Sequence, residues 1–293
     1  MRDLIDEIKM YGLLHKDVIS KLIHKKYYYQ SSETYANTLF NLRDVKQANK
    51  IYWEEILLRA HFASVTSIMR NEKWLSGIIM SIETNNFIVF SASLRGFLES
   101  VTDSCYSLSS PFDFTNNYKN IKQAVDGNLS KYLISQELEE KLIHFQFAAK
   151  SDKSGIKHNQ PLSATDYIRM FDQHSDINTK KLYSKLCEVV HPAHDSISYF
   201  KTNVRETENF EYSITKNTQD DLHIEIIISE YRDVISNLLK LSLSTPFIYL
   251  KILNLFEIDL VQSEYIDSCI FNNLINEDVW IEVLGMVRKS YEL

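Results

Sequence analysis

Reactive side chains are concentrated between Lys180 and Ser196, where a predicted helix ends on a histidine followed by a proline. A residue that precedes proline disfavours the helical conformation, so a helix that begins near Thr179 should end at Val190 or His191. An imidazole at a helix C-terminus lies beside unpaired carbonyls and can act as acid or base near neutral pH. It can equally well cap those carbonyls and have a structural role only. We therefore treat His191 as a candidate catalytic residue.

A second candidate lies in the apolar stretch 87–107, which should form a buried helix. Arg95 and Glu99 are four residues apart, which places them on one helix face within reach of an ion pair. A charge among apolar residues has to be paired, because an isolated buried charge is very costly. Gly96 favours a close approach of another helix at this point. The pair is either an internal ion pair that fixes helix packing or part of a site, in which case Arg95, Glu99 and His191 should share one pocket.

His194 and Asp195 form the dipeptide with which HD-type phosphohydrolases hold a divalent metal, together with an earlier histidine and a later aspartate. Imidazole and carboxylate groups are suitable ligands for such an ion. A lone His-Asp pair is common by chance, so the leading interpretation contains no metal or cofactor. In the metal interpretation the earlier ligand would be His158, His174 or His191, and the later one Asp220, Asp221 or Asp233.

The Arg-x-x-x-Glu helix and the later segment Tyr-x-x-Leu-Cys-Glu-Val-Val-His-Pro together resemble a group of bacterial helical proteins that are similar to the HEPN superfamily. Many HEPN proteins are RNA-cleaving effectors of toxin–antitoxin, CRISPR and anti-phage systems. The likeness covers about residues 87–196. It implies an all-α fold, metal-independent RNA cleavage and a site that is completed across a homodimer.

The nuclease pattern of that superfamily is an arginine, four to six further residues and then a histidine at a helix end. This chain has Lys185, five residues and then His191, so a lysine stands where the pattern has arginine. Lysine is a point charge and cannot offer a phosphate a two-pronged contact. The resemblance implies that His191 is the general base or acid at the 2′-hydroxyl and leaving group. Lys185 or Arg95 would then stabilise the charge on the phosphorane.

The composition supports an all-α fold and excludes several enzyme classes. The 293 residues include only six glycines and four prolines, which favours long helices over β-hairpins. The sequence has no Gly-rich phosphate loop, no G-x-S-x-G motif and no H-E-x-x-H motif, which disfavours P-loop enzymes, dehydrogenases and common serine hydrolases. We predict a multi-helix bundle of HEPN-like character.

Cysteine usage and hydropathy indicate a cytoplasmic protein. The three cysteines, Cys105, Cys187 and Cys269, are widely separated in apolar helical contexts, as expected of free thiols in a reducing compartment. The N-terminus has early charges and no apolar core of a secretory signal. Charged or polar residues interrupt every apolar stretch before about 18 positions, so we expect no membrane span.

Charge is unevenly distributed along the chain. The net charge is −7; residues 1–50 carry 9 Lys/Arg against 6 Asp/Glu, and residues 201–293 carry 8 against 16. An acidic C-terminal third would repel a phosphate backbone, so contact with RNA would use the N-terminal two thirds. Ordinary solvated faces explain the same asymmetry. The run Tyr27-Tyr28-Tyr29 after two lysines could stack bases, but we favour a docking face for a second subunit or partner protein.

Apolar periodicity divides the chain into two expected parts, an N-terminal helical layer over 1–84 and a HEPN-like bundle with further C-terminal helices over 85–293. One continuous domain is the alternative. Residues 200–218 fit neither period and should form a long loop or a small β excursion. The expected helices cover residues 3–24, 32–70, 73–83, 87–107, 135–149, 163–171, 179–191, 192–199, 220–241, 246–256, 267–274 and 277–291.

The leading functional hypothesis is a bacterial anti-phage defence or toxin-type protein, a homodimer with metal-independent endoribonuclease activity and a partner protein of the same defence system. A catalytically inactive helical scaffold, sensor or interaction module is the alternative. In that alternative, Arg95, Glu99 and His191 are structural. An HD-type metal phosphohydrolase is the third hypothesis.

Overall fold

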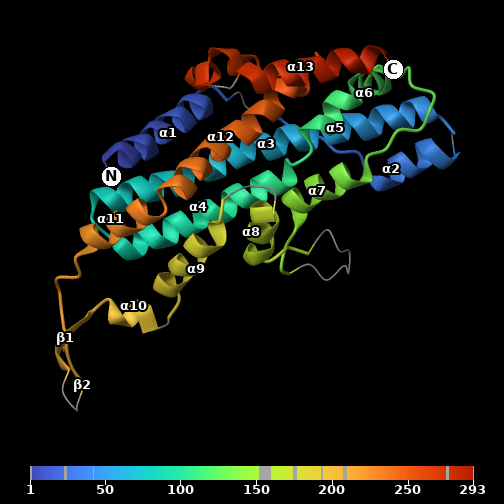
Figure 1. The fold of residues 1–293 in the computed structure, drawn as a ribbon. Coiled ribbons are helices and arrows are strands. Elements are labelled where there is room, and N and C mark those ends of the chain that lie inside the picture. The colour runs from blue at the N-terminus through green and yellow to red at the C-terminus, as the bar shows by residue number, and fades with distance from the viewer. Residues whose placement is uncertain are drawn as a thin grey trace. The chain divides into compact units, whose positions relative to one another are not determined.

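The computed structural model describes residues 2–22, 25–41, 43–151, 160–173, 177–192, 194–206, 210–274 and 277–292. Within these ranges the chain is helical almost throughout, as the sequence predicts, and the fold is an all-α multi-helix bundle (Figure 1). The helices are α1 (Arg2–Ser20), α2 (Ser32–Ala36), the π-helix Asn37–Asn41, α3 (Val45–Glu83), α4 (Phe87–Ser107), α5 (Pro111–Asn116), α6 (Tyr118–Val125), α7 (Gln136–Phe147), α8 (Ala164–Gln173), α9 (Thr179–Val190), α10 (His194–Ser198), α11 (Asp220–Glu230), α12 (Arg232–Asn254), two 3-10 helices (Glu264–Ser268 and Ile270–Leu274) and α13 (Glu277–Glu292).

The chain forms two compact units, each assembled from three separate stretches of sequence. Unit 1 comprises Met1–Leu13, Arg70–Thr102 and Ala164–Lys240. Unit 2 comprises Leu14–Met69, Asp103–Ser163 and Leu241–Leu293. Unit 1 contains α8 to α11 and most of α4, and therefore all the candidate catalytic residues.

The core of unit 1 forms around α4. Phe90, Leu94 and Phe97 follow the three-to-four-residue helical spacing and are fully buried. Leu182 and Leu186 of α9 are fully buried as well. Each such side chain stabilises the fold by roughly 1.5–3 kcal/mol relative to an exposed position. This packing fixes α4 and α9, the two helices that carry the candidate site.

Unit 2 has a separate, aromatic core. The ring of Phe114 lies edge-on to those of Trp53, Tyr249 and Phe256, with centroid distances of 6.5, 5.8 and 6.4 Å. Edge-on arrangements of this kind add about 0.5–1.5 kcal/mol per pair beyond the area buried. Pro111 occupies the first turn of α5, where proline is well tolerated, and so begins the helix that carries Phe114.

The predicted break near residues 70–73 is wrong, because α3 is continuous over Val45–Glu83. Asn71 and Glu72 are buried and Arg70 is half-buried, and Ser100 of α4 pairs with Arg70 and Asn71. Arg70 Nε donates to Ser100 Oγ at 2.8 Å, and Ser100 Oγ donates to Asn71 Oδ1 at 2.6 Å. With no glycine or proline in this segment and its polar groups satisfied, nothing interrupts the helix.

The predicted break before Pro246 is also wrong, since α12 continues through this residue. Proline removes one helical hydrogen bond, but tertiary packing of the buried residues around it, such as Leu243 and Phe247, offsets that loss. The break lies earlier in the sequence, at Tyr231 between α11 and α12.

Residues 200–218, which fit neither the helical nor the strand period, contain an antiparallel hairpin of β1 (Lys201–Glu206) and β2 (Phe210–Ile214). The hairpin lies between α10 and α11 (Figure 1). Helix α11 begins directly after it. The carboxylate of Asp220, in the first turn of α11, accepts a hydrogen bond of 3.0 Å from the Phe87 backbone N–H at the start of α4. One carboxylate therefore satisfies the N-terminus of α4 and anchors α11 to it.

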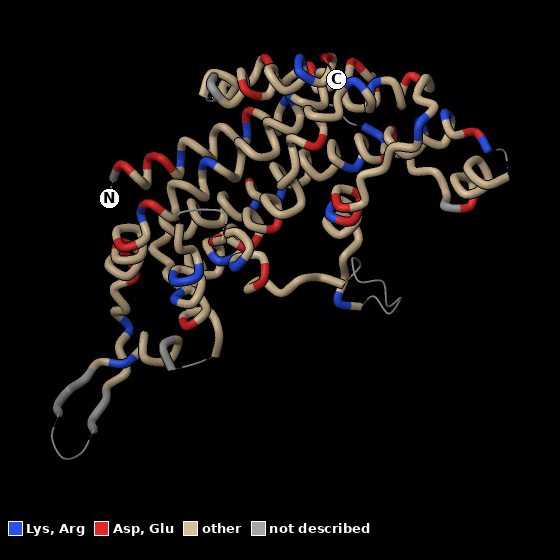
Figure 2. Tube along the Cα trace, turned by 45° about the vertical axis from the view of Figure 1, so that its right-hand side comes forward, with Lys and Arg blue, Asp and Glu red and all other residues tan. Residues whose placement is uncertain are grey.

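No helix in the described ranges is long and apolar enough to cross a membrane. Blue and red segments alternate along the same helices in Figure 2, so acidic and basic residues are interspersed. This distribution is typical of solvated helix faces rather than of one extended basic surface.

Candidate functional site

The candidate site begins with the end of α9, which the sequence predicts correctly. The helix stops at Val190, and His191 follows in an extended conformation with φ −78° and ψ 149°. Its backbone N–H still donates to the Cys187 carbonyl at 2.9 Å. The following Pro192 excludes the helical conformation at His191, which leaves the imidazole exposed at the helix end.

Arg95 is positioned by its own helix. Its Nε donates to Glu99 Oε1 at 2.9 Å, and the two side chains are 21% and 34% exposed. Burial alone would lower the pKa of Arg95, but the hydrogen bond and the charge of Glu99 raise it above its usual value. The guanidinium is therefore a fixed cation with one edge held by Glu99 and its two terminal nitrogens directed elsewhere.

One of those terminal nitrogens reaches His191. Arg95 Nη1 lies 3.0 Å from His191 Nε2, and a guanidinium can only donate. His191 Nε2 must therefore accept this hydrogen bond, which assigns the ring proton to Nδ1. The unprotonated ring nitrogen and a permanent cation face each other across one hydrogen bond.

Tyr183 completes the cluster. The Arg95 Cζ atom lies 5.4 Å from the centroid of the Tyr183 ring, and Nη2 donates to its hydroxyl at 3.5 Å. Burial and a hydrogen bond with Cys187 raise the pKa of Tyr183 to about 12. The phenol therefore stays protonated at neutral pH and can donate a hydrogen bond. We call Arg95, Glu99, Tyr183 and His191 the arginine–histidine cluster.

A glycine allows the helix that carries Arg95 to pack closely. A Cβ atom at Gly96 would lie 2.7 Å from ring atoms of Trp74 in α3. Any larger residue would push the indole and α4 apart. The close approach expected from the sequence is present, and its partner is a tryptophan side chain.

Lys185 lies elsewhere on α9. The described partners of the Arg95 guanidinium are Glu99, His191, Tyr183 and Cys187. Lys185 instead pairs with Glu188, with Nζ 3.3 Å from Oε2. Residues 183, 187 and 191 are four apart and share a helix face, whereas a residue two positions further along lies about 200° around the axis.

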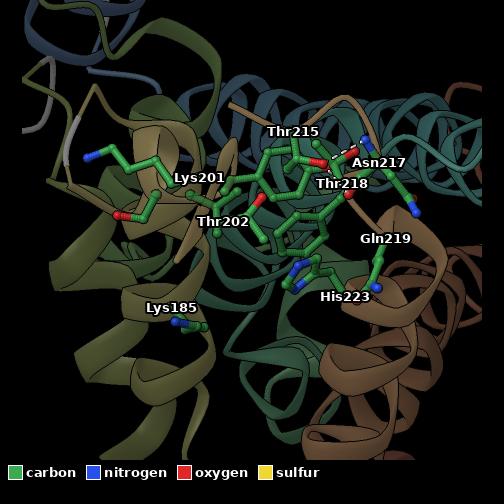
Figure 3. Close-up of a pocket in the computed structure, with 12 residues that line it drawn as sticks. Lys185, Lys201, Thr202, Thr215, Asn217, Thr218, Gln219 and His223 are labelled. Carbon is green, nitrogen blue, oxygen red and sulfur yellow. Dashed lines mark hydrogen bonds between the residues drawn. The ribbon is translucent and has the colours of Figure 1, made fainter. Parts of the chain in front are cut away.

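Lys185 lines a cavity of about 430 Å³ in unit 1. Figure 3 shows Lys185 on α9 at one side and Gln219 and His223 of the α11 segment at the other, with the ammonium of Lys201 directed away. The remaining lining residues are Phe87, Val189, Ser198, Tyr199, Thr202, Thr215, Asn217 and Thr218.

The structure does not favour the metal interpretation for the residues it describes. No group of three His, Cys, Asp or Glu side chains in those ranges is arranged to hold a metal ion. His191, one of the three candidates for the earlier histidine ligand, uses its Nε2 to accept a hydrogen bond from Arg95. The side chains of His194 and Asp195, and all of His158 and His174, lie outside the described residues.

Two contributors to the site were not assigned from the sequence. Tyr183 belongs to the segment that carries the resemblance, and its spacing of eight from His191 is the signal that places both on one face. His223, to which the sequence assigns no functional role, lines the cavity.

Comparisons of the chain with protein-family models, curated proteins and solved structures find no match.

Proposed function

We propose that this protein is a metal-independent endoribonuclease of the bacterial defence or toxin type, acting as a homodimer with His191 and Arg95 at its reacting centre. The observation that carries the proposal is the 3.0 Å contact between Arg95 Nη1 and His191 Nε2 at an exposed helix end. The resemblance of residues 87–196 to HEPN-like proteins supports the same chemistry.

The contact supplies two of the groups that cleavage of RNA requires. A phosphodiester that enters between them takes over the Arg95 donor and leaves the lone pair of His191 Nε2 free. His191 then accepts the 2′-hydroxyl proton, the 2′-oxygen bonds to phosphorus, and the bond from phosphorus to the 5′-oxygen breaks. The products are a 2′,3′-cyclic phosphate and a 5′-hydroxyl.

The other members of the cluster have supporting roles. Arg95 stabilises the additional negative charge on the phosphorane, and Glu99 orients its guanidinium. The leaving 5′-oxygen needs a proton, which His191 of a second copy supplies in the proposed dimer. Lys185, whose ion pair and cavity lie on another face of α9, is not needed for this step.

The test is cleavage of a mixed RNA by the purified chain in the presence of EDTA. We expect cyclic-phosphate ends, a loss of rate of about 10²–10⁴-fold for His191→Ala, and a loss of about 10²–10³-fold for Arg95→Ala. Arg169→Ala is the matched control, because Arg169 forms an exposed ion pair with Asp166 in the same unit. Cleavage that needs a metal, or that survives His191→Ala, would contradict the proposal.

A catalytically inactive scaffold is the second candidate. It is favoured by one observation, that all three nitrogens of the Arg95 guanidinium are already hydrogen-bonded within the protein, to Glu99, His191 and Tyr183. In that case His191→Ala should lower the melting temperature substantially while no RNA cleavage is detected in the wild type. In the nuclease proposal the exposed His191 changes the melting temperature little.

A further inference from the structure

The cavity beside α9 combines aromatic rings with polar side chains. Three rings form one wall: Phe87 and His223 stack with centroids 5.1 Å apart at 25°, and Tyr199 lies 5.5 Å from His223. Phe87 is buried, whereas Tyr199 and His223 are partly exposed. The wall therefore presents aromatic surface on which a planar ring can stack.

Hydrogen-bonding groups without charge surround these rings. Hydroxyls of serine and threonine and the amides of Asn217 and Gln219 line the cavity, together with Lys185 and Lys201. No carboxylate is among the twelve lining residues. The carboxylate of nearby Asp220 is occupied by the Phe87 N–H and the Thr218 hydroxyl. The one lysine directed at the cavity, Lys185, has an exposed ion pair with Glu188, and an anionic group in the cavity can compete for its ammonium.

Size narrows the choice of ligand. A volume of about 430 Å³ lies in the range of sites for small molecules, roughly 300–1,000 Å³. A ligand that contacts the aromatic wall, the hydroxyl and amide side chains and Lys185 needs a planar ring, several hydroxyl groups and an anionic group. A nucleotide combines them: its base stacks, its ribose hydroxyls meet the hydroxyl and amide side chains, and its phosphate meets Lys185.

We infer that this cavity binds a single nucleotide, either free or as one residue of an RNA strand. The inference does not rest on the proposed ribonuclease activity, because the arginine–histidine cluster lies on a different face of α9. Both sources of the ligand present the same base, sugar and phosphate, so the test separates them.

The wild-type chain is titrated with AMP, GMP, CMP and UMP by calorimetry. Adenosine and ribose 5-phosphate serve as references that lack the phosphate or the base, and each is expected to bind roughly tenfold or more weakly than AMP. A 2′-O-methyl oligonucleotide, which has no free 2′-hydroxyl to attack phosphorus, reports strand binding without cleavage. Binding of mononucleotides indicates a free ligand, and binding of the oligonucleotide alone indicates an RNA strand.

Variants link any binding to the cavity. Lys185→Ala should weaken binding roughly tenfold, whereas Lys180→Ala on another face of the same helix should not change it. His223→Ala should weaken binding, and His223→Phe should retain it because the ring remains. Circular dichroism confirms that each variant is folded.

Two results would overturn the inference: no binding of mononucleotides or oligonucleotide to the wild type, or wild-type affinity in both Lys185→Ala and His223→Ala. His191→Ala provides the separation from the proposed function, because it should bind nucleotides normally. A chain without RNA cleavage that still binds through Lys185 and His223 would contradict the ribonuclease proposal and support this one.

Discussion

Two hydrogen-bonded histidines, His191 and His61, show how the surroundings decide what an imidazole does. His191 is exposed and shares Nε2 with a guanidinium, so a substrate can reach it. His61 is buried in unit 2, with Nδ1 2.9 Å from the Tyr27 hydroxyl and Nε2 2.9 Å from Ser263 Oγ. The order of serine, histidine and a third partner resembles that of hydrolases, but Ser263 is only 1% exposed and no substrate can approach it. We assign His61 a structural role.

That role predicts a loss of stability in acid. Burial, aided by the charge of Lys25, lowers the pKa of His61 from 6.5 to about 3 in the folded chain. Between these values the unfolded chain binds the extra proton, so stability is complete above pH 6.5 and falls as the pH drops toward 3, by about 1.4 kcal/mol per pH unit.

Urea midpoints measured from pH 7 to pH 4.5 check this expectation. His61→Gln cannot titrate, so its midpoint should fall less steeply over that range even though the variant is less stable at pH 7. Equal slopes for the two proteins would show that His61 is not the group responsible.

At the scale of elements, the periodicity of helix α9 places the arginine–histidine cluster and the cavity on different faces. Tyr183, Cys187 and His191 face Arg95, and Lys185 and Val189 line the cavity. Local spacing makes this division predictable, as it does the end of α9 before Pro192 and the bounds of α4. The contact of His191 with Arg95 joins residues 96 positions apart, and no spacing rule reports such a pair.

The predictions about elements that were wrong also failed because of contacts between residues far apart in the sequence. The polar run 70–73 resembles a helix break in the sequence, whereas in the structure Ser100 of α4 pairs with Arg70 and Asn71 and the helix continues. Likewise, two of the three consecutive tyrosines belong to the fold rather than to a docking face: Tyr27 packs on Phe62, and Tyr29 lies under Arg59, leaving Tyr28 exposed. Tertiary partners decided both cases.

Two glycines provide a matched test of helix packing. Gly96→Ala should destabilise the chain by about 1–3 kcal/mol, because the new methyl group overlaps the Trp74 ring. Gly285→Ala in α13 meets nothing within 4 Å and should stabilise it by up to about 1 kcal/mol through helix propensity. Thermal unfolding of the two variants measures the expected loss of stability in Gly96→Ala and the expected gain in Gly285→Ala. A stabilised Gly96→Ala would show that α4 does not pack on Trp74 as described.

At the scale of the whole molecule, the two compact units are each built from three stretches of sequence. The predicted division into residues 1–84 and 85–293 stays a prediction. The proposed dimer likewise remains to be tested. Its premise is that the cluster within one copy supplies a base, a cation and an orienting carboxylate, while the second copy supplies the acid.

Mixed dimers test that premise. The mass in solution should be twice 34.3 kDa by sedimentation. If both copies of His191 take part in each cleavage, equal amounts of wild type and His191→Ala, allowed to exchange, should retain about a quarter of the wild-type activity. Independent sites would retain about half, which would contradict a composite site.

The hydrogen bond between Asp220 and the start of α4 has a consequence for how the chain folds. It closes a loop of 133 residues, and the entropy of closing so long a loop costs about 4 kcal/mol before the bond contributes anything. Contacts of such separation slow folding and form late, so α4 and α11 must first be brought together by the packing of their apolar faces. We therefore expect the Asp220 hydrogen bond to form after unit 1 has assembled, so that its loss should change the rate of unfolding more than the rate of folding.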